Sequence, residues 1–200
     1  TMRKLLTAIC SLMVVGACQT TDGRYSEEWR EISREEARLV WLEQRPFKTQ
    51  GKFYARATPQ RYEEVYAFDT NFRRAELWLG LLSRQRVWTS RSTVADFKKD
   101  GGNWNHFKDK KITWGEIHKG YNSFGKLMHS VATVDVETCL IFTNFVMKST
   151  NDDDGRYKGK LHGYHCRPVI NVFTAAEVEG FLYGYEFNGE AYSGEGLAGS

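Results

Sequence analysis

The feature that most constrains the fold is a turn-forming segment placed midway between two cysteines. Residues 151–155, NDDDG, are strong turn chemistry, and they separate 138–147 from 157–166, two stretches with the composition of strands. In a symmetric hairpin around this turn, paired positions have residue numbers that sum to about 305. Cys139 and Cys166 then lie opposite one another, within the Cα separation that a disulfide tolerates. The sequence therefore predicts an antiparallel hairpin with a cysteine at each of two paired positions.

The first 18 residues have the pattern of an export signal that ends in a cysteine. A basic pair at 3–4 precedes an almost unbroken apolar run at 5–15, and residues 15–18, VGAC, form a small-residue cleavage site. This motif resembles the lipobox of bacterial lipoproteins. The resemblance implies that residues 1–17 are removed and that Cys18 is acylated on its thiol and on its amine. The apolar run is shorter than the about 20 residues that a membrane-spanning helix needs.

The lipoprotein resemblance gives each of the four cysteines a separate fate. Cys10 leaves with the signal and Cys18 carries the lipid, so Cys139 and Cys166 remain. Because the cell envelope is an oxidising compartment, we expect this remaining pair to form a disulfide. Closing a loop of about 28 residues contributes roughly 3.5 kcal/mol of stability in the chain-entropy model.

The sequence predicts one folded domain between a tether and a tail. Residues 18–25 are polar and suit a tether, 26–187 are long enough for a single core, and 188–200 are rich in Gly, Ser and Ala and are expected to be disordered. Enterobacterial lipoproteins that stay in the inner membrane carry an aspartate after the lipidated cysteine. Gln19 stands there in this chain, which by that resemblance indicates the periplasmic face of the outer membrane.

Two capping boxes predict two helices. Residues 33–36, SREE, precede an apolar stripe and predict a helix over 34–44, which Pro46 ends. Residues 174–177, TAAE, predict a second, amphipathic helix over 175–187.

The remaining segments are read mainly as strands and loops. Residues 62–68 fit a helical face, whereas 77–79 and 87–89 fit strands, and both interpretations stay open between 53 and 88. Residues 126–147 contain two apolar stretches that read as successive strands, and 101–103, GGN, indicate a turn or loop. The expected fold class is therefore α+β: an antiparallel sheet of about four to six strands, helices packed on one face, and a disulfide-bridged C-terminal hairpin.

The C-terminal half also resembles a pattern in uncharacterised envelope proteins of Gram-negative bacteria. The resemblance rests on residues 139–142, CLIF, and 161–166, LHGYHC, and it covers roughly a third of the mature chain. It supports the disulfide hairpin and implies no activity.

Several motifs invite a chemical interpretation that their geometry disfavours. His162 and His165 could bind a metal with the cysteines, but on a strand they point to opposite faces. Residues 150–155 match the start of a calcium loop, but position 12 is Leu161 instead of a glutamate. The solvated hairpin turn is the favoured interpretation. We therefore predict no metal site and no cofactor.

Nucleophilic catalysis is disfavoured in the same way. Cys166 with Arg167 resembles the nucleophile motif of envelope L,D-transpeptidases, where the arginine is two residues away, but a bridged cysteine cannot be a thiolate. Residues 120–125, GYNSFG, lack the glycine that a serine nucleophile elbow requires. The acid pairs 27–28 and 63–64 read as neighbours on solvated helices, so the sequence identifies no catalytic residue.

One basic stretch is the remaining candidate site. The chain has 28 basic and 25 acidic residues, and the removal of Arg3 and Lys4 with the signal leaves 26 basic residues, a net charge of +1. Between residues 84 and 126, however, the sequence contains ten basic residues and only four acidic ones, with aromatic residues among them. An exported protein meets anionic envelope polymers and acidic partner proteins, not nucleic acid. The candidate contacts are Arg84, Arg86, Arg91, Lys98, Lys99, Lys108, Lys110 and Lys111; the alternative is a solvated face over core aromatics.

The function expected from these features is that of a membrane-anchored envelope lipoprotein, acting as a non-catalytic binding or assembly accessory. The alternative is an envelope hydrolase or transferase that acts on cell-wall or glycan substrates through an acid or histidine outside these motifs.

Overall fold

The computed structural model describes residues 26–41, 51–70, 72–83, 86–89, 93–148 and 155–187. The predicted signal, tether and tail lie outside the described residues, and so do residues 150–154 of the hairpin turn. Among the described residues, no helix is long and apolar enough to cross a membrane.

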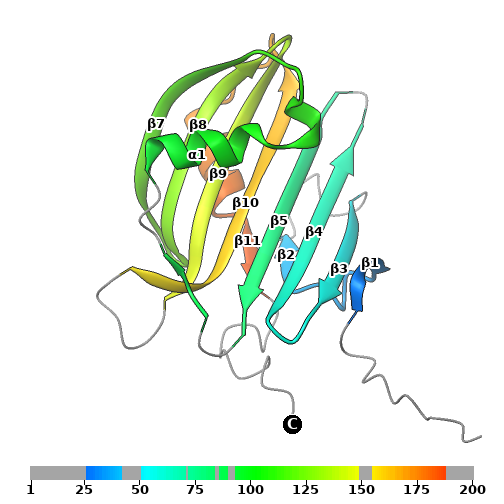
Figure 1. The fold of residues 1–200 in the computed structure, drawn as a ribbon. Coiled ribbons are helices and arrows are strands. Elements are labelled where there is room, and N and C mark those ends of the chain that lie inside the picture. The colour runs from blue at the N-terminus through cyan, green and yellow to red at the C-terminus, as the bar shows by residue number, and fades with distance from the viewer. Residues whose placement is uncertain are drawn as a thin grey trace, which may run out of the picture.

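Most of the described chain forms one antiparallel sheet of nine strands (Figure 1). The strand order is β1-β3-β4-β5-β10-β9-β8-β7, the short β6 pairs with β10, and β2 and β11 form a separate two-stranded sheet. The strands are β1 (Ser26–Ile32), β2 (Leu39–Trp41), β3 (Lys52–Ala57), β4 (Arg61–Asp69), β5 (Arg74–Leu82), β6 (Trp88–Thr89), β7 (Ile112–Asn122), β8 (Gly125–Val134), β9 (Glu137–Lys148), β10 (Arg156–Pro168) and β11 (Tyr185–Phe187).

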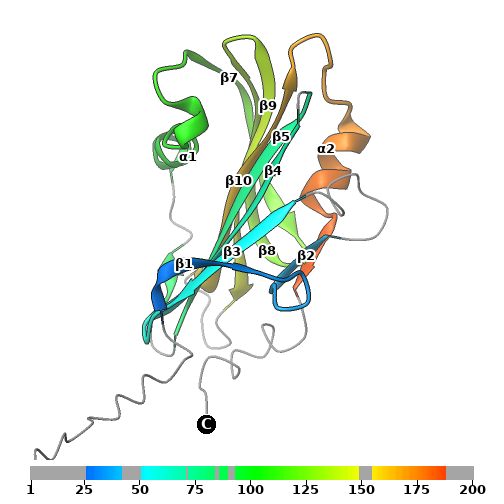
Figure 2. The same cartoon turned by 90° about the vertical axis from the view of Figure 1, so that its right-hand side faces the viewer.

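One helix lies on each face of the sheet (Figure 2). Helix α1 (Val94–Gly102), followed by the 3-10 turn η1 (Asn105–Phe107), covers one face, which we call the α1 face, and α2 (Ala175–Leu182) lies on the other, the α2 face. Strand alternation divides the apolar side chains between two cores. Leu77 and Leu79 of β5 pack in the larger core with α2, whereas Tyr164 of β10 packs with Phe97 and Phe107 in the smaller core under α1.

The fold class predicted from the sequence is wrong. The protein is mostly β, its main sheet has nine strands instead of four to six, and the helices do not share one face. The additional strands β3 and β4 come from the ambiguous region, where β4 takes the residues that also fit a helical face, and β1 and β7 form in segments for which no strand was predicted. Its Tyr66 and Phe68 are two residues apart and both buried, which is the spacing of a strand.

The helix predicted over 34–44 is also wrong. Ser33 and Glu36 do exchange both bonds of a capping box, with the Ser33 N–H 2.9 Å from Glu36 Oε2 and the Glu36 N–H 3.3 Å from Ser33 Oγ. The chain makes only a single turn there and then enters β2.

A buried carboxylate explains this outcome. The backbone N–H groups of Arg38 and Leu39 donate to Glu64, at 2.8 and 3.0 Å, and not to the carbonyls one helical turn before them. Tyr62 donates its hydroxyl to the same carboxylate at 2.7 Å. Burial nevertheless raises the pKa of Glu64, although these three donors oppose the shift.

The acid pair at 63–64 therefore does not lie on a solvated helix. Both residues are buried on β4, where neighbours point to opposite faces. Glu63 pairs with Arg56 and Arg61 and accepts a bond from the Trp78 indole N–H at 3.1 Å. The pair at 27–28 is exposed, as expected, but it lies on β1.

The second capping box is confirmed. Thr174 and Glu177 exchange both capping bonds, and α2 follows directly. The helix ends at Leu182, earlier than predicted, because Tyr185 turns into β11 to pair with β2. Helix α1 has a capping box of the same kind and contains Gly101, where a turn was expected. A Cβ there would lie 2.9 Å from Ile141 and Trp114, so glycine permits the close approach of α1 to the sheet.

The C-terminal hairpin and its disulfide are confirmed. Strands β9 and β10 pair antiparallel with partners whose numbers sum to 305, from Tyr157 opposite Lys148 to Pro168 opposite Glu137. Cys166 lies opposite Cys139, their Cα atoms are 4.1 Å apart, and the two sulfurs are bonded. The strands predicted within 126–147 are also present, as β8 and β9.

Candidate functional site

The best-formed polar site lies on the α1 face, at the end of the sheet where β4 and β10 finish and β5 and β9 begin. Asp69 ends β4 and Arg74 begins β5 directly opposite it, because the turn between them is short. Glu137 begins β9 after a tight turn whose Asp135 has a positive φ of 51°. His106 comes from η1, which is held by the buried ring of Phe107 4.7 Å from that of Tyr164. We call Asp69, Arg74, His106, Lys110 and Glu137 the His106 cluster, and this end of the sheet the site end.

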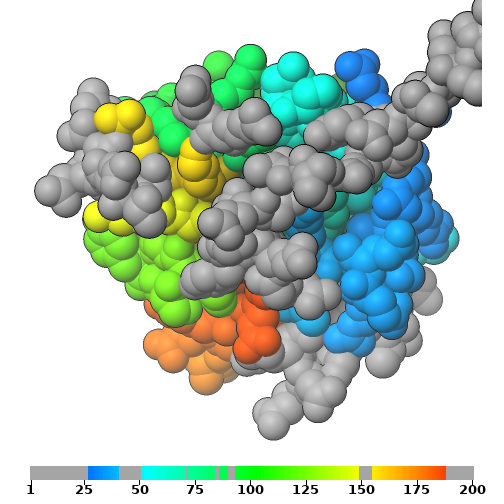
Figure 3. Space-filling view, turned by 90° about the horizontal axis from the view of Figure 1, so that it is seen from below, coloured from blue at the N-terminus to red at the C-terminus, as the bar shows by residue number. Residues whose placement is uncertain are grey.

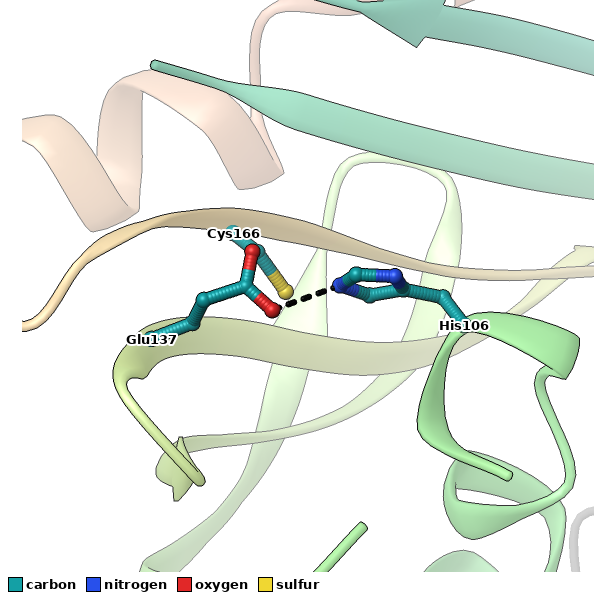
Figure 4. A group of neighbouring side chains, drawn as sticks. All are labelled: His106, Glu137 and Cys166. Atoms are coloured by element: carbon teal, nitrogen blue, oxygen red, sulfur yellow. Dashed lines mark hydrogen bonds and ion pairs between the residues drawn. The ribbon is translucent and has the colours of Figure 1, made fainter. Parts of the chain in front are cut away.

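Both ring nitrogens of His106 are engaged. Nε2 lies 2.7 Å from Glu137 Oε2 (Figure 4). Nδ1 lies 2.5 Å from a guanidinium nitrogen of Arg74. Because a guanidinium only donates, Nδ1 must accept, and Nε2 therefore carries the proton and donates to Glu137. The ring also stacks on Tyr164, with centroids 5.5 Å apart and planes 13° apart. These contacts fix a neutral imidazole in one tautomer and one orientation.

The other four residues of the cluster form two pairs of opposite charge. Lys110 donates to the same Glu137 oxygen at 3.1 Å, and Arg74 pairs with Asp69 at 2.5 Å. Burial of the ring, with the nearby Lys110 and Arg74 cations, lowers the pKa of His106, although Glu137 opposes the shift. His106 is thus a neutral link between two ion pairs.

Two hollows of about 610 and 700 Å³ open beside the cluster. Both are lined by Asp69, Arg74 and His106, so the cluster forms the wall between them. The second hollow is also lined by the exposed side chains of Phe72 and Val136. The site therefore combines fixed charges with an apolar rim.

A metal ion does not fit this site. His106, Glu137 and Cys166 place one potential ligand atom each within 4.8 Å of one another (Figure 4). The Cys166 sulfur, however, is bonded to Cys139 and cannot act as a thiolate ligand. Lys110 already contacts Glu137, and Arg74 already contacts His106. Their positive charges would repel a metal cation.

The histidines considered from the sequence lie on opposite faces of β10, as predicted. His162 is on the α1 face, with its ring 4.8 Å from that of Trp104. His165 is on the α2 face, with its ring 5.0 Å from that of Phe181. The strand geometry thus separates the two rings that a shared metal site would require.

The basic candidates do not form one patch. Arg84 and Arg91 lie outside the described residues. Arg86 is exposed near β6, which pairs with the first residues of β10, far along the sheet from the site end. Lys98 and Lys99 are exposed on α1. Lys110 belongs to the His106 cluster, and Lys108 and Lys111 are exposed beside it at the site end.

Sequence reasoning missed the centre of the site. His106, Arg74 and Glu137 come from three separate elements and share no local motif. Only the neighbouring Lys110 was among the predicted contacts. Comparison with protein-family models gives no match, and comparisons with curated proteins and with solved structures give none either.

Proposed function

We propose that this chain is a membrane-anchored cell-envelope lipoprotein that acts as a non-catalytic binding module, and that it binds an acidic partner protein through the site end. The His106 cluster is the observation that carries this proposal. It presents fixed charges beside open hollows, and each of its members already has a partner inside the cluster.

The bonding of His106 supports binding over catalysis. A general base needs a free nitrogen within reach of the proton that it removes. The His106–Glu137 pair has the acid and histidine that the hydrolase or transferase alternative requires, but Arg74 occupies the second nitrogen. An ordered set of charges held in this way suits recognition of a fixed pattern of opposite charges on a partner.

Exposed cations beside the cluster determine which charge the partner would carry. Arg73, Lys108 and Lys111 are exposed, and none of their side chains forms an ion pair with another described residue. The cluster contributes two further cations, but each is paired with an acid. Asp109 and Asp135 are also exposed at this end, so three cations against two acids leave a net charge of +1, which favours a partner with carboxylates or phosphates.

Apolar side chains at the same end favour a protein over a polysaccharide. Phe72 is 73% exposed and Val136 75% exposed, and both line the hollow that contains Lys110. Ile170, in the loop after β10, is 86% exposed. Exposed apolar residues surrounded by charges are typical of protein interaction sites.

The position of the first described strand is consistent with a lipid anchor. Ser26 pairs with Ala57, next to the β3–β4 turn, so β1 begins at the end of the sheet opposite the site end (Figure 1). Figure 3 looks onto that opposite end, where the blue residues at the start of the described chain lie at the periphery. Cys18 precedes Ser26 by only a few residues in sequence. An anchor there would leave the site end pointing away from the membrane.

Site-directed crosslinking in intact cells tests this proposal. A photoreactive amino acid replaces Val136 in the full-length chain, and the matched control carries it at exposed Gln60, at the opposite end. We expect one protein adduct from position 136 that position 60 does not give. A carbohydrate adduct would instead indicate a cell-wall polymer and contradict the protein partner.

Charge-reversal variants test whether the adduct depends on recognition by the cations at the site end or only on the partner being nearby. Lys108→Glu with Lys111→Glu should suppress the adduct, whereas Lys98→Glu with Lys99→Glu makes the same change of charge on α1 and should leave it intact. Equal adduct yields in both variants would refute a role for the cations at the site end.

A further inference from the structure

A pair of histidines lies across two neighbouring strands, away from the His106 cluster. His118 of β7 and His129 of β8 are direct partners in the register, and their rings stack with centroids 4.9 Å apart and planes 22° apart. Paired residues on antiparallel strands have Cβ atoms about 4.5–5.5 Å apart. At that separation, one ring nitrogen from each histidine can reach a single ion at the usual zinc–nitrogen bond length of about 2.0–2.1 Å.

A carboxylate lies on the same face, next to a bulge in β7. The register shifts between Trp114 and Ile117, so that Gly115 and Glu116 together oppose Val131. A Cβ on Gly115 would lie 2.3 Å from the Val131 carbonyl oxygen, so the bulge requires a glycine there. Glu116 and His118 are two residues apart on β7, so they face the same side.

These residues line a hollow on the α2 face. It has a volume of about 390 Å³ and lies between β7, β8 and α2. Glu116, His118 and His129 line it from the sheet, and Glu179 lines it from α2. Two imidazoles and two carboxylates therefore face one space that is large enough for an ion and its water ligands.

We propose that His118 and His129 chelate a divalent transition-metal ion of the zinc class, with water in the remaining coordination positions. Imidazole is a common ligand of Zn²⁺ in proteins, and the Glu116 carboxylate in the same hollow supplies a compensating negative charge. Glu179 faces the site from α2 and supplies a second compensating negative charge.

The protonation state of His129 is compatible with this role. A histidine binds a metal only when it is neutral. Burial, with a smaller contribution from His118, lowers the pKa of His129 to about 4, so that this ring is neutral at physiological pH. The site is on the face opposite the His106 cluster and does not depend on the function proposed for that cluster.

Calorimetric titration with zinc sulfate tests the proposal. The chain is purified without a polyhistidine tag and without a thiol reductant, which would open the disulfide. We expect one Zn²⁺ per chain at neutral pH. His118→Ala and His129→Ala should each weaken binding by about tenfold or more, because even the loss of an outer-shell partner of a ligand costs that much.

Lys119→Ala is the matched control, because Lys119 is exposed on β7 next to His118 and points to the other face. It should leave zinc affinity unchanged. His129 is partly buried, so the exposed His118 gives the deciding variant if the His129 variant is unstable. Zinc should also raise the melting temperature of the wild type and not that of His118→Ala. Unchanged affinity in His118→Ala, or no binding by the wild type at millimolar zinc, would overturn the proposal.

Discussion

Mild acid should destabilise this protein through a histidine buried in its larger core. His165 is 5% exposed on β10, and its ring stacks on Phe181 and meets Phe173 edge-on, with centroids 5.0 and 5.2 Å away. Burial, assisted by the Arg167 and Arg73 cations and opposed by Glu177, lowers the pKa of His165 to about 3. The ring is therefore neutral in the folded protein throughout the mildly acidic range.

The sign of the effect follows from proton binding. In the unfolded chain, the imidazole takes up a proton below its ordinary pKa of about 6.5. The folded state does not, so the free energy of unfolding decreases by about 1.36 kcal/mol for each pH unit below that value. Between pH 6.5 and pH 5, the His165 contribution amounts to about 2 kcal/mol. It is fully present above pH 6.5 and is lost as the pH falls.

His165→Gln isolates this contribution, because glutamine is polar but does not titrate. The free energy of unfolding is measured by urea denaturation of both proteins at pH 7.5 and pH 5. We expect the wild type to lose about 2 kcal/mol more than the variant between the two conditions.

Other titrating groups cancel in this comparison. His129 and His162 have pKa values lowered to about 4 and 3 and also favour unfolding in acid, whereas the raised pKa of Glu64 acts in the opposite direction. All three are common to both proteins. The Arg167 guanidinium keeps the pKa of Glu177 far below its usual range, so this ion pair is still intact at pH 5. A stability difference that is equal at both pH values would show that the folded state does not hold His165 neutral.

Three further predictions concern other parts of the chain. Cys139→Ser with Cys166→Ser should lower the free energy of unfolding by about 3.5 kcal/mol, as measured by urea denaturation, and unchanged stability would contradict the disulfide. Cys18→Ser should abolish metabolic labelling with a fatty-acid analogue; a labelled serine variant would exclude Cys18 as the lipid attachment site. Gly101→Leu should destabilise the fold by about 1–3 kcal/mol, because its side chain would push α1 from Ile141 and Trp114, and a neutral effect in thermal unfolding would show that α1 can shift at no cost.

The sequence alone could predict structure wherever the determining residues are close together along the chain. The C-terminal hairpin follows from a turn segment and two strand-like stretches, so the register of Cys139 and Cys166 could be counted from residue numbers. The start of α2 follows from Thr174 and Glu177, whose bonds stay within one helical turn. These elements are specified by contacts that are local or fixed by a symmetric turn.

Tertiary structure determined the conformation of those segments in which contacts with distant residues compete with local sequence signals. The capping box at Ser33 forms its bonds, yet Glu64, 25 residues away from Leu39, takes the next backbone donors and directs the chain into a strand. The sequence predicted too few strands because the apolar pattern of a single strand is short, and a strand is stable only when it pairs with its neighbours.

The candidate sites divide in the same way. Lys110 could be selected from the sequence because it belongs to a basic stretch, but its partner Glu137 follows a turn 27 residues later. His106 becomes part of a site only when η1 brings it over the beginnings of β5 and β9. Local sequence determined which segments could be helices and hairpins, whereas packing of the nine-stranded sheet determined which side chains meet. The physical reason is that hydrogen bonds and ion pairs depend on distance in space, and this fold brings its functional residues together from elements far apart in the chain.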